Sequence, residues 1–364
     1  MNIQNSPNIN FKGYDARRLK GFFMGTNSGG IIDNMQQIGR KEGFKIYSKM
    51  GSGNNITCGE SIAEALPIGD REMWAQDVWT FSKDKLLSSQ NPIRVKPICE
   101  HFNISNGENK KHIPGGNIFI TDNNGVDELF IGEDSLRGIT TTELKNKYGV
   151  DKIHILPQMD YHIDLFIRPL DNKRILVADD ELTLQVLEKG RNKFEEFCNS
   201  EKGQNPIAKT IKFRFNHLIN SFKKDIKKND LPQTEDIAKI ISQAGYEPIR
   251  VPGRLYQTCT FSKPEPLTFL SHDCNFMNAN VLKNKNDEII YITNKSSIDR
   301  QLLLESSYTK DLDFSFEKEF AKSIEPYVKP NKIYFVDGEH NYISNIMLKG
   351  MQGGIHCTCS EIPL

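Results

Sequence analysis

The chain has 364 residues, of which 37% are hydrophobic and 26% charged, and its 47 basic side chains balance 47 acidic ones. A chain of this length and composition folds into one to three globular domains, which excludes a wholly disordered protein. The formal net charge of zero argues against a nucleic-acid-binding protein, because such domains usually carry a strong basic excess.

Membrane and secretory signals are also missing from the sequence. No run of about 18 apolar residues occurs, so no membrane span is expected. Residues 1–10 are polar and lack the apolar centre of a secretory signal. The seven cysteines, an odd number at scattered positions, are typical of reduced thiols. The sequence therefore predicts a cytoplasmic protein without a disulfide framework.

Short apolar segments alternate with helical patterns from the start of the chain. An apolar run predicts a buried strand at 19–24, and apolar residues recur at helical spacing over 29–41. Gly43 ends that helix, and an alternating strand follows at 44–47. The same alternation continues with a hairpin at 117–121 and 128–132, helices at 140–148 and 314–324, and strands at 152–156, 164–169, 174–178, 247–251, 288–293 and 332–336.

The longest helical patterns lie together in the middle of the chain, at 181–197, 209–228 and 234–244. No Pro/Ser-rich linker separates them from the strands on either side. Strand–helix alternation of this kind is typical of the α/β class. We therefore predict one domain, residues 1–364, with a helical insertion at 181–245.

The last residues of the chain contain a candidate nucleophile. Gly353 and Gly354 permit a sharp backbone turn, and His356 and Cys357 follow directly. A cysteine on such a turn is well placed to present a thiolate, although a free cysteine is usually a small buried hydrophobe. Cys359 completes a C-x-C pair, but no second pair has the spacing of a zinc site. We therefore expect no metal.

Two further motifs combine a histidine or tryptophan with a carboxylate. His162 and Asp164 begin a predicted strand, where residues two apart share a face and would put a base beside an anion. Trp74 and Trp79 flank Asp77, and an indole ring attracts cations. A structural role is the alternative for each motif. The glycine turn at Gly115-Gly116-Asn117 leads into a strand and either lines the same cleft or is only a turn.

Together these motifs resemble the guanidine-modifying superfamily, which includes protein-arginine, agmatine and arginine deiminases and dimethylarginine hydrolases. The family order is W-x-x-D, G-N, H-x-D and a terminal G-x-x-H-C. This chain has Trp74…Asp77, Gly116-Asn117, His162…Asp164 and Gly353…His356-Cys357 in that order, over roughly residues 70 to 363. The resemblance implies the pentein fold, a ring of five ββαβ modules around a central cleft.

The resemblance also implies a reaction and a role for each motif. Cys357 would attack the guanidinium carbon, and His162 would transfer protons. Asp77 and Asp164 would hold the guanidinium nitrogens. The residues implied to line the substrate site are Trp74, Asp77, Asp164, Gly116 and Asn117. No organic cofactor is implied. Calcium control is not expected, because Thr80 and Ile118-Phe119 stand where the calcium-dependent animal enzymes have carboxylates.

The substrate is less sharply indicated than the reaction. Trp74-Ala75-Gln76-Asp77 resembles the W-x-Q-D of protein-arginine deiminases, whereas agmatine deiminases usually have W-x-R-D. This predicts a hydrolase that converts arginine residues of peptides to citrulline. Agmatine or free arginine, and transfer of the amidino group to an amine, are the alternatives. A non-catalytic pentein that acts as a binding module is an alternative of another class, and a homodimer is left open.

Overall fold

The structure of the protein is a computed structural model. It describes residues 17–24, 29–49, 56–58, 61–63, 75–82, 85–88, 95–96, 99–100, 102–107, 111, 113–200, 207–228, 234–261, 267–299, 309, 311–337 and 354–363. Within these residues, no helix combines the length and the apolar character that crossing a membrane requires.

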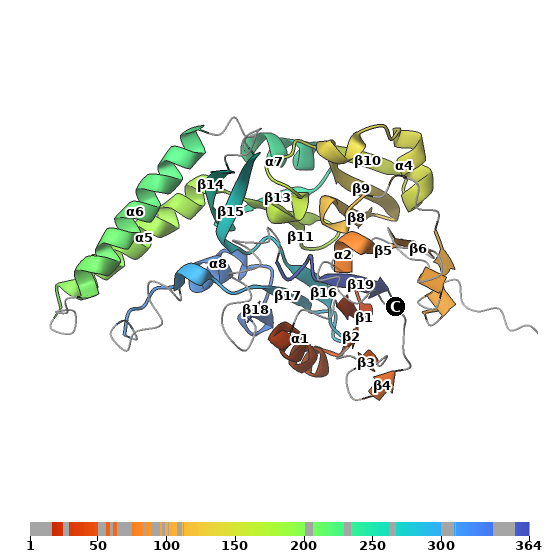
Figure 1. The fold of residues 1–364 in the computed structure, drawn as a ribbon, viewed down its shortest axis with the longest axis horizontal. Helices are drawn as coiled ribbons and strands as arrows, with labels where there is room; N and C mark the ends of the chain where they lie inside the picture. Colours follow the sequence, from red (N-terminus) through yellow and green to blue (C-terminus); the bar gives the residue numbers. More distant parts are fainter. Residues whose placement is uncertain are drawn as a thin grey trace, which may run out of the picture.

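The described strands form small sheets that repeat one internal order (Figure 1). Two strands run antiparallel, and a third strand runs parallel to the second. This order occurs five times in the described part of the chain, and in four cases helices connect the second strand to the third. The alternation expected of an α/β protein is therefore present.

The first unit combines the two ends of the described chain. β19 (Cys359–Pro363) pairs antiparallel with β1 (Leu19–Met24), and α1 (Gly29–Glu42) leads to the parallel strand β2 (Lys45–Lys49). The apolar stripe of α1 is buried, and Gly43, with a φ of 90°, ends the helix as predicted. β3 (Ile56–Cys58) and β4 (Ser61–Ala63) extend this sheet.

The second and third units follow the short helix α2 (Ala75–Val78). The second contains β5 (Trp79–Ser82), β6 (Lys85–Ser88) and β7 (Ser105–Asn106). The third contains β8 (Ile118–Asn123), β9 (Val126–Gly132), α4 (Thr141–Tyr148) and β10 (Lys152–Leu156). Thr140 caps α4 in a reciprocal capping box with Glu143, which fixes the start of the helix predicted at 140–148.

The fourth unit contains the long helices. β11 (Ile167–Pro169) and β12 (Arg174–Ala178) are followed by α5 (Asp180–Cys198), α6 (Ile207–Lys228), α7 (Thr234–Gln243) and then β13 (Glu247–Val251). Figure 1 shows α5 and α6 side by side, projecting away from the sheets, whereas α7 lies near β13. The hairpin of β14 (Arg254–Phe261) and β15 (Leu267–Asn275) follows and contacts α6.

The fifth unit closes the arrangement against the first. It contains β16 (Asn280–Lys283), β17 (Ile289–Asn294), α8 (Phe316–Ile324) and β18 (Ile333–Val336). Phe22 of β1, Met35 of α1 and Ile292 of β17 belong to one buried hydrophobic cluster. The first and fifth units therefore share a core. This shared core holds β19 of the first unit in place relative to the fifth unit, which begins shortly after β15 ends.

Candidate active site

A tight turn immediately before β19 presents Cys357. The turn covers residues 355–358, and the Cys357 side chain is almost fully buried. Gly354 is required by close packing: a Cβ there would lie 2.6 Å from Asn294 Nδ2 and 2.7 Å from Asn278 Oδ1. The glycine turn inferred from the sequence is therefore real at Gly354, whereas Gly353 lies outside the described residues.

His162 and Asp164 come together with Cys357, although not for the reason that the sequence suggested. The strand predicted from Asp164 onward is wrong at its start. Residues Ile163–Leu165 form a 3₁₀ turn, and β11 begins only at Ile167. One ligand atom each from His162, Asp164 and Cys357 nevertheless lie within 4.8 Å of one another. The turn therefore brings the imidazole of His162 and the carboxylate of Asp164 close to the thiol of Cys357.

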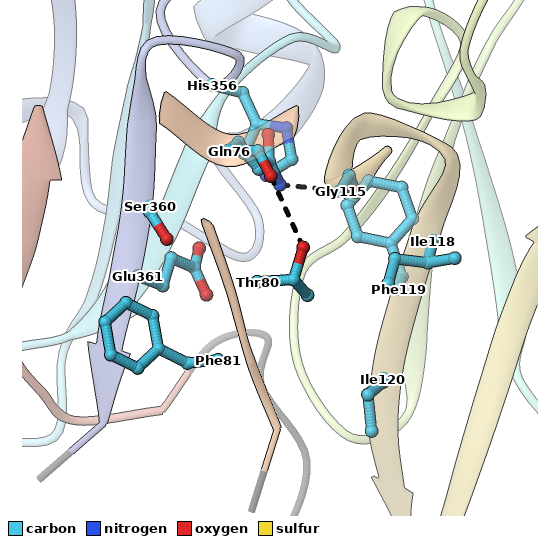
Figure 2. Close-up of a pocket in the computed structure, with 10 residues that line it drawn as sticks. All are labelled: Gln76, Thr80, Phe81, Gly115, Ile118, Phe119, Ile120, His356, Ser360 and Glu361. Atoms are coloured by element: carbon cyan, nitrogen blue, oxygen red, sulfur yellow. Dashed lines mark hydrogen bonds between the residues drawn. The ribbon is translucent and has the colours of Figure 1, made fainter. Parts of the chain in front are cut away.

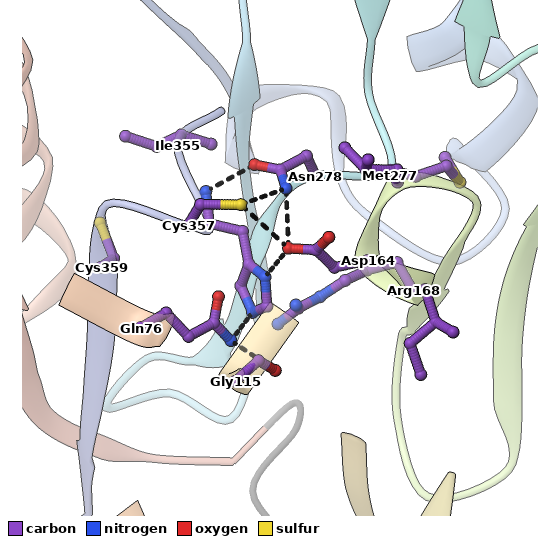
Figure 3. Close-up of polar contacts among 12 residues, drawn as sticks. Gln76, Gly115, Asp164, Arg168, Met277, Asn278, Ile355, Cys357 and Cys359 are labelled. Atoms are coloured by element: carbon purple, nitrogen blue, oxygen red, sulfur yellow. Dashed lines mark hydrogen bonds and ion pairs between the residues drawn. The ribbon is translucent and has the colours of Figure 1, made fainter. Parts of the chain in front are cut away.

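The carboxylate of Asp164 is the centre of this cluster (Figure 3). Its Oδ2 atom lies 2.7 Å from His356 Nδ1 and 3.3 Å from Cys357 Sγ. Asn278 Nδ2 donates to the same oxygen at 2.8 Å. Asp164 has no exposed surface. Because a buried carboxylate needs several donors, these contacts are what make the charge tolerable at this position.

Asn278 is the residue that sequence reasoning missed. Its Nδ2 lies 2.8 Å from Asp164 Oδ2 and 3.1 Å from Cys357 Sγ. Its Oδ1 accepts from the His356 backbone N–H at 2.9 Å, which fixes which end of the amide is the donor. A signal was present, because asparagine recurs three times within residues 275–280, and each of the three side chains is buried.

Two further asparagines, Asn275 and Asn294, hold the Asn278 turn in place. Asn275 Oδ1 accepts from the backbone N–H groups of Met277 and Asn278, and Asn275 Nδ2 donates to the carbonyl of Leu165. Asn294 Nδ2 donates to the Asn278 carbonyl, while its Oδ1 accepts from the Ile355 N–H. The turns that carry Asp164, Asn278 and Cys357 are therefore joined by buried amides.

His356 connects Asp164 to α2. Burial, with smaller contributions from Arg168 and His162, holds the pKa of His356 well below 6.5, so the imidazole is neutral. A neutral ring that donates from Nδ1 to Asp164 accepts at Nε2. Gln76 Nε2 lies 2.7 Å from that atom and supplies the donor. Both nitrogens of His356 are thus engaged in the network.

The glycine–asparagine turn supports the loop of His162. A Cβ on Gly116 would lie 2.6 Å from His162 Nδ1 and 3.1 Å from Asp164 Oδ2, so glycine permits this approach. Asn117 Oδ1 accepts from the Ile163 backbone N–H at 3.1 Å. The structure thus brings Gly116 and Asn117 to the cluster, where Asn117 orients the backbone.

The W-x-Q-D segment is only partly described. Trp74 lies outside the described residues, and only the backbone of Asp77, within α2, is described. The neighbouring Gln76 N–H donates to the Cys357 carbonyl at 3.1 Å. α2 therefore packs directly against the turn that carries the candidate nucleophile, and the substrate-gripping role of Asp77 stays a prediction.

His162, Asp164 and Cys357 also offer a ligand set that zinc accepts. Asn278 Nδ2 bears on that reading, because it lies close to both Cys357 Sγ and Asp164 Oδ2. An N–H donor there disfavours a cation bound between these two ligand atoms. The donor set fits a hydrogen-bonded thiol better than a metal centre.

The other thiol of the C-x-C pair faces a different environment. Cys359 is fully buried, and its sulfur points away from Asp164 in Figure 3. It belongs to the hydrophobic cluster of the first and fifth units. Burial raises the pKa of Cys359 to about 12. Cys359 is therefore a packing residue that stays protonated at neutral pH.

A small pocket adjoins His356 and Gln76 (Figure 2). Its space of about 40 Å³ has room for one or a few water molecules. Gln76 Oε1 is buried beside it and has no hydrogen-bond partner within the described part of the chain. Neither Cys357 nor Asp164 is among the described residues that line this pocket. We therefore interpret it as a water-filled space next to His356 and not as the substrate site.

Comparisons with known proteins support the architecture. No family model and no curated protein matches the sequence. Among solved structures, an agmatine deiminase of C. jejuni is 13% identical, with a TM-score of 0.51 over 97% of this chain and 95% of that one. A candidate agmatine deiminase is 10% identical, with a TM-score of 0.51 over 96% and 95%. At these identities the likeness concerns the fold. The chain has the pentein fold, as the motifs implied.

Proposed function

We propose that this protein is a hydrolase that converts a guanidinium group into a ureido group and ammonia, with Cys357 as the nucleophile. The observation that carries the proposal is the convergence of one thiol, one carboxylate and one imidazole. Their reactive atoms lie within 4.8 Å of one another in the pentein fold. A thiol beside a base and a cation-binding anion is suited to attack on a cationic carbon centre.

Substrate binding begins with Asp164. A guanidinium is planar and presents N–H donors in a fixed fork that matches a carboxylate. Because Asp164 Oδ2 lies 3.3 Å from Cys357 Sγ, a guanidinium held by Asp164 places its carbon next to the sulfur. This positioning supplies much of the rate, because it replaces a collision between free reactants. We assign Asp77 as the second anion, on the motif alone.

The bound cation also favours the thiolate. A free cysteine thiol ionises with a pKa of about 8.5, so most of it is protonated at neutral pH. In this structure the thiol of Cys357 donates to Asp164, and Asn278 Nδ2 lies 3.1 Å from the sulfur. When guanidinium donors take over the carboxylate, the thiol proton passes to His162 of the same cluster. The substrate charge and the Asn278 donor then stabilise the resulting thiolate.

The chemistry proceeds in two halves. The Cys357 thiolate adds to the guanidinium carbon, and the bond to one terminal nitrogen breaks as His162 protonates that nitrogen, which leaves as ammonia. A thiouronium remains on sulfur. His162 then accepts a proton from water, and the resulting hydroxide adds to the same carbon. The C–S bond breaks to give the thiolate and the ureido product, and the remaining hydroxyl proton passes to solvent. Neither a metal nor an organic cofactor is part of this proposal.

Peptidyl arginine is the substrate that we propose to test first, on the W-x-Q-D pattern, and agmatine the second, because an agmatine deiminase shares the fold. The structure weakens the pattern as a guide to substrate choice. Gln76 contacts His356 Nε2 and the Gly115 carbonyl, so its amide supports the network. Gln76 therefore carries less information about the substrate than the motif suggested.

The experiment is to measure ureido product and ammonia from an arginine peptide, agmatine and free arginine, each with and without an added amine acceptor. We expect turnover of at least one of these compounds, and its complete loss in Cys357→Ala. Cys274→Ala is the matched control, because Cys274 is also a fully buried free thiol but lies on β15. Turnover retained in Cys357→Ala would refute the nucleophile. A protein that binds these compounds without turnover would be a binding module.

A further inference from the structure

The loop that carries His162 is tied to a buried charge cluster. Asp160, two residues before His162, has a side chain that is 5% exposed. Its Oδ1 accepts from the Tyr161 backbone N–H at 2.7 Å. Its Oδ2 lies 2.6 Å from His272 Nε2 and 3.5 Å from Arg254 Nη1, both on the β14–β15 hairpin.

From this arrangement we infer that Asp160 is a positioning residue, which sets the place of His162 through its contacts with Arg254 and His272. The inference rests on the proposed function, in which His162 transfers the protons. It assigns a role in the reaction to the β14–β15 hairpin, which carries Arg254 and His272.

Buried charges of this kind are costly, so their presence needs a reason. Arg254 and Asp160 are both almost fully buried, and Arg254 also contacts Asp180 Oδ1 at 3.4 Å. Burial raises the pKa of Asp160, but His272 and Arg254 outweigh burial and lower it, so the carboxylate stays charged. Well-packed apolar residues often stabilise a protein as much as a buried ion pair does. Stability alone therefore does not explain the Asp160–Arg254 pair, and we infer that the pair serves to define the geometry of the His162 loop.

The backbone on both sides of His162 is held by hydrogen bonds. On one side, the Tyr161 N–H donates to Asp160 and the Tyr161 carbonyl accepts from Gln158 Nε2 at 2.6 Å. On the other side, the Ile163 N–H donates to Asn117. His162 itself has Gly116 against its ring, with no room for a Cβ. Its imidazole therefore follows any shift of the Asp160 anchor.

The same cluster reaches the other half of the site. His272 Nδ1 lies 3.5 Å from Asn275 Nδ2, and Asn275 Oδ1 accepts from the Asn278 N–H. At its far end, Arg254 contacts Asp180, the first residue of α5. The base of the α5–α6 pair is thus connected to the His162 loop and to the Asn278 turn through one set of polar contacts.

The decisive variant is Asp160→Asn, which keeps the shape and the Oδ1 acceptor but removes the charge that pairs with Arg254. We expect kcat to fall about 10- to 100-fold, as for a small displacement of a catalytic group, with KM nearly unchanged. Alkylation of Cys357 by iodoacetamide should change much less than kcat, because the contacts that Asp164 and Asn278 make with the sulfur are not replaced. His272→Gln, a milder change that keeps the Arg254–Asp160 pair, should act in the same direction.

Asp171→Asn is the matched control. Asp171 also accepts backbone N–H groups at Oδ1, from Lys173 and Arg174, and pairs with an arginine at Oδ2. Arg174 lies 4.7 Å from the ring of Tyr327, as Arg254 lies 4.6 Å from that of Tyr256. Loss of stability should be seen in both Asp→Asn variants, whereas the fall in kcat should be confined to Asp160→Asn.

An equal loss of kcat in the two Asp→Asn variants, compared at equal folded fraction, would overturn the positioning role, as would wild-type kcat in Asp160→Asn. A readout without turnover keeps the inference separate from the proposed function. In NMR spectra of protein with labelled histidines, the His162 imidazole resonances can be assigned by their loss in His162→Gln. These resonances should shift in Asp160→Asn and stay in place in Asp171→Asn. Unmoved resonances in both would refute the inference. Absence of turnover in the wild type would count against the proposed function alone.

Discussion

Replacing Asn278 by aspartate changes the donor at the centre of the site at almost constant shape. The new carboxylate keeps an oxygen for the His356 backbone N–H, which Asn278 Oδ1 accepts at 2.9 Å. Its second oxygen takes the place of Nδ2, 2.8 Å from Asp164 Oδ2 and 3.1 Å from Cys357 Sγ. The variant thus exchanges an N–H donor for an acceptor facing both groups.

The magnitude follows from the contacts that are lost. A hydrogen bond to a charged group contributes about 1.5–3 kcal/mol. If the Nδ2 contact with the Cys357 thiolate is worth this much in the transition state, kcat falls roughly 10- to 150-fold. The new carboxyl beside Asp164 adds to this effect, because two carboxylates at such a distance retain one proton between them. We therefore expect at least a hundredfold loss in kcat.

Two measurements separate the cause from general damage. The pH profile of the rate of Cys357 alkylation by iodoacetamide should shift to higher pH in Asn278→Asp, because less thiolate is present at a given pH. Asn284→Asp is the control. Asn284 also donates through Nδ2 to carboxylates, those of Glu42 and Glu288, and accepts backbone N–H groups at Oδ1. It should lower the melting temperature and leave kcat unchanged.

The result that would refute this reasoning is specific. If Asn278→Asp retains wild-type kcat and alkylates with the wild-type dependence on pH, the Nδ2 donor does not act on the thiolate. If Asn284→Asp loses as much kcat as Asn278→Asp, the loss reflects folding. In either case the arrangement around Asp164 would be structural.

Two further predictions concern the glycine turn and the stability of the fold. Gly116→Ala should lower kcat at least tenfold with the protein still folded, because its Cβ would meet His162 Nδ1 at 2.6 Å; unchanged kinetics would show that the ring has room to move. Burial and the neighbouring Asp299 raise the pKa of Glu317 from 4.5 to about 7. A raised pKa means that the folded state binds the extra proton, so this residue costs stability as pH rises from about 4.5 to 7. Glu317→Gln should therefore gain up to about 3 kcal/mol relative to wild type over that range in denaturant titrations, and a gain independent of pH would contradict the assignment.

Much of the architecture is predictable from local patterns. The apolar run at β1, the helical stripe of α1 and the helix α4 each lie where the sequence placed them. These elements bury one face or end at residues with particular backbone preferences, and both features are determined by residues close together in the sequence. The β14–β15 hairpin was not predicted, because its core positions include Arg254 and His272, whose burial depends on partners from distant parts of the chain.

The H-x-D motif shows where pattern reasoning stops. Alternation suggested a strand at His162, but Ile163 and Asp164 are both fully buried, so no exposed face exists to produce true alternation. Asn117 captures the Ile163 N–H and turns the backbone into a 3₁₀ conformation. The structure brings His162 and Asp164 of the motif together, and the geometry that unites them required a partner 46 positions away.

The same principle explains why the sequence suggested Cys357 as a candidate nucleophile but did not predict the residues that surround it. Cys357 lies on a turn fixed by Asn278 and Asn294 from the fifth unit and its entry, and β19 immediately pairs with β1. The sulfur is therefore positioned only when the fifth unit has packed against the first. Since each contact joins residues more than 60 positions apart, no local window of sequence contains both partners. The geometry around Cys357 therefore depends on long-range contacts from the fifth unit and on the pairing of β19 with β1.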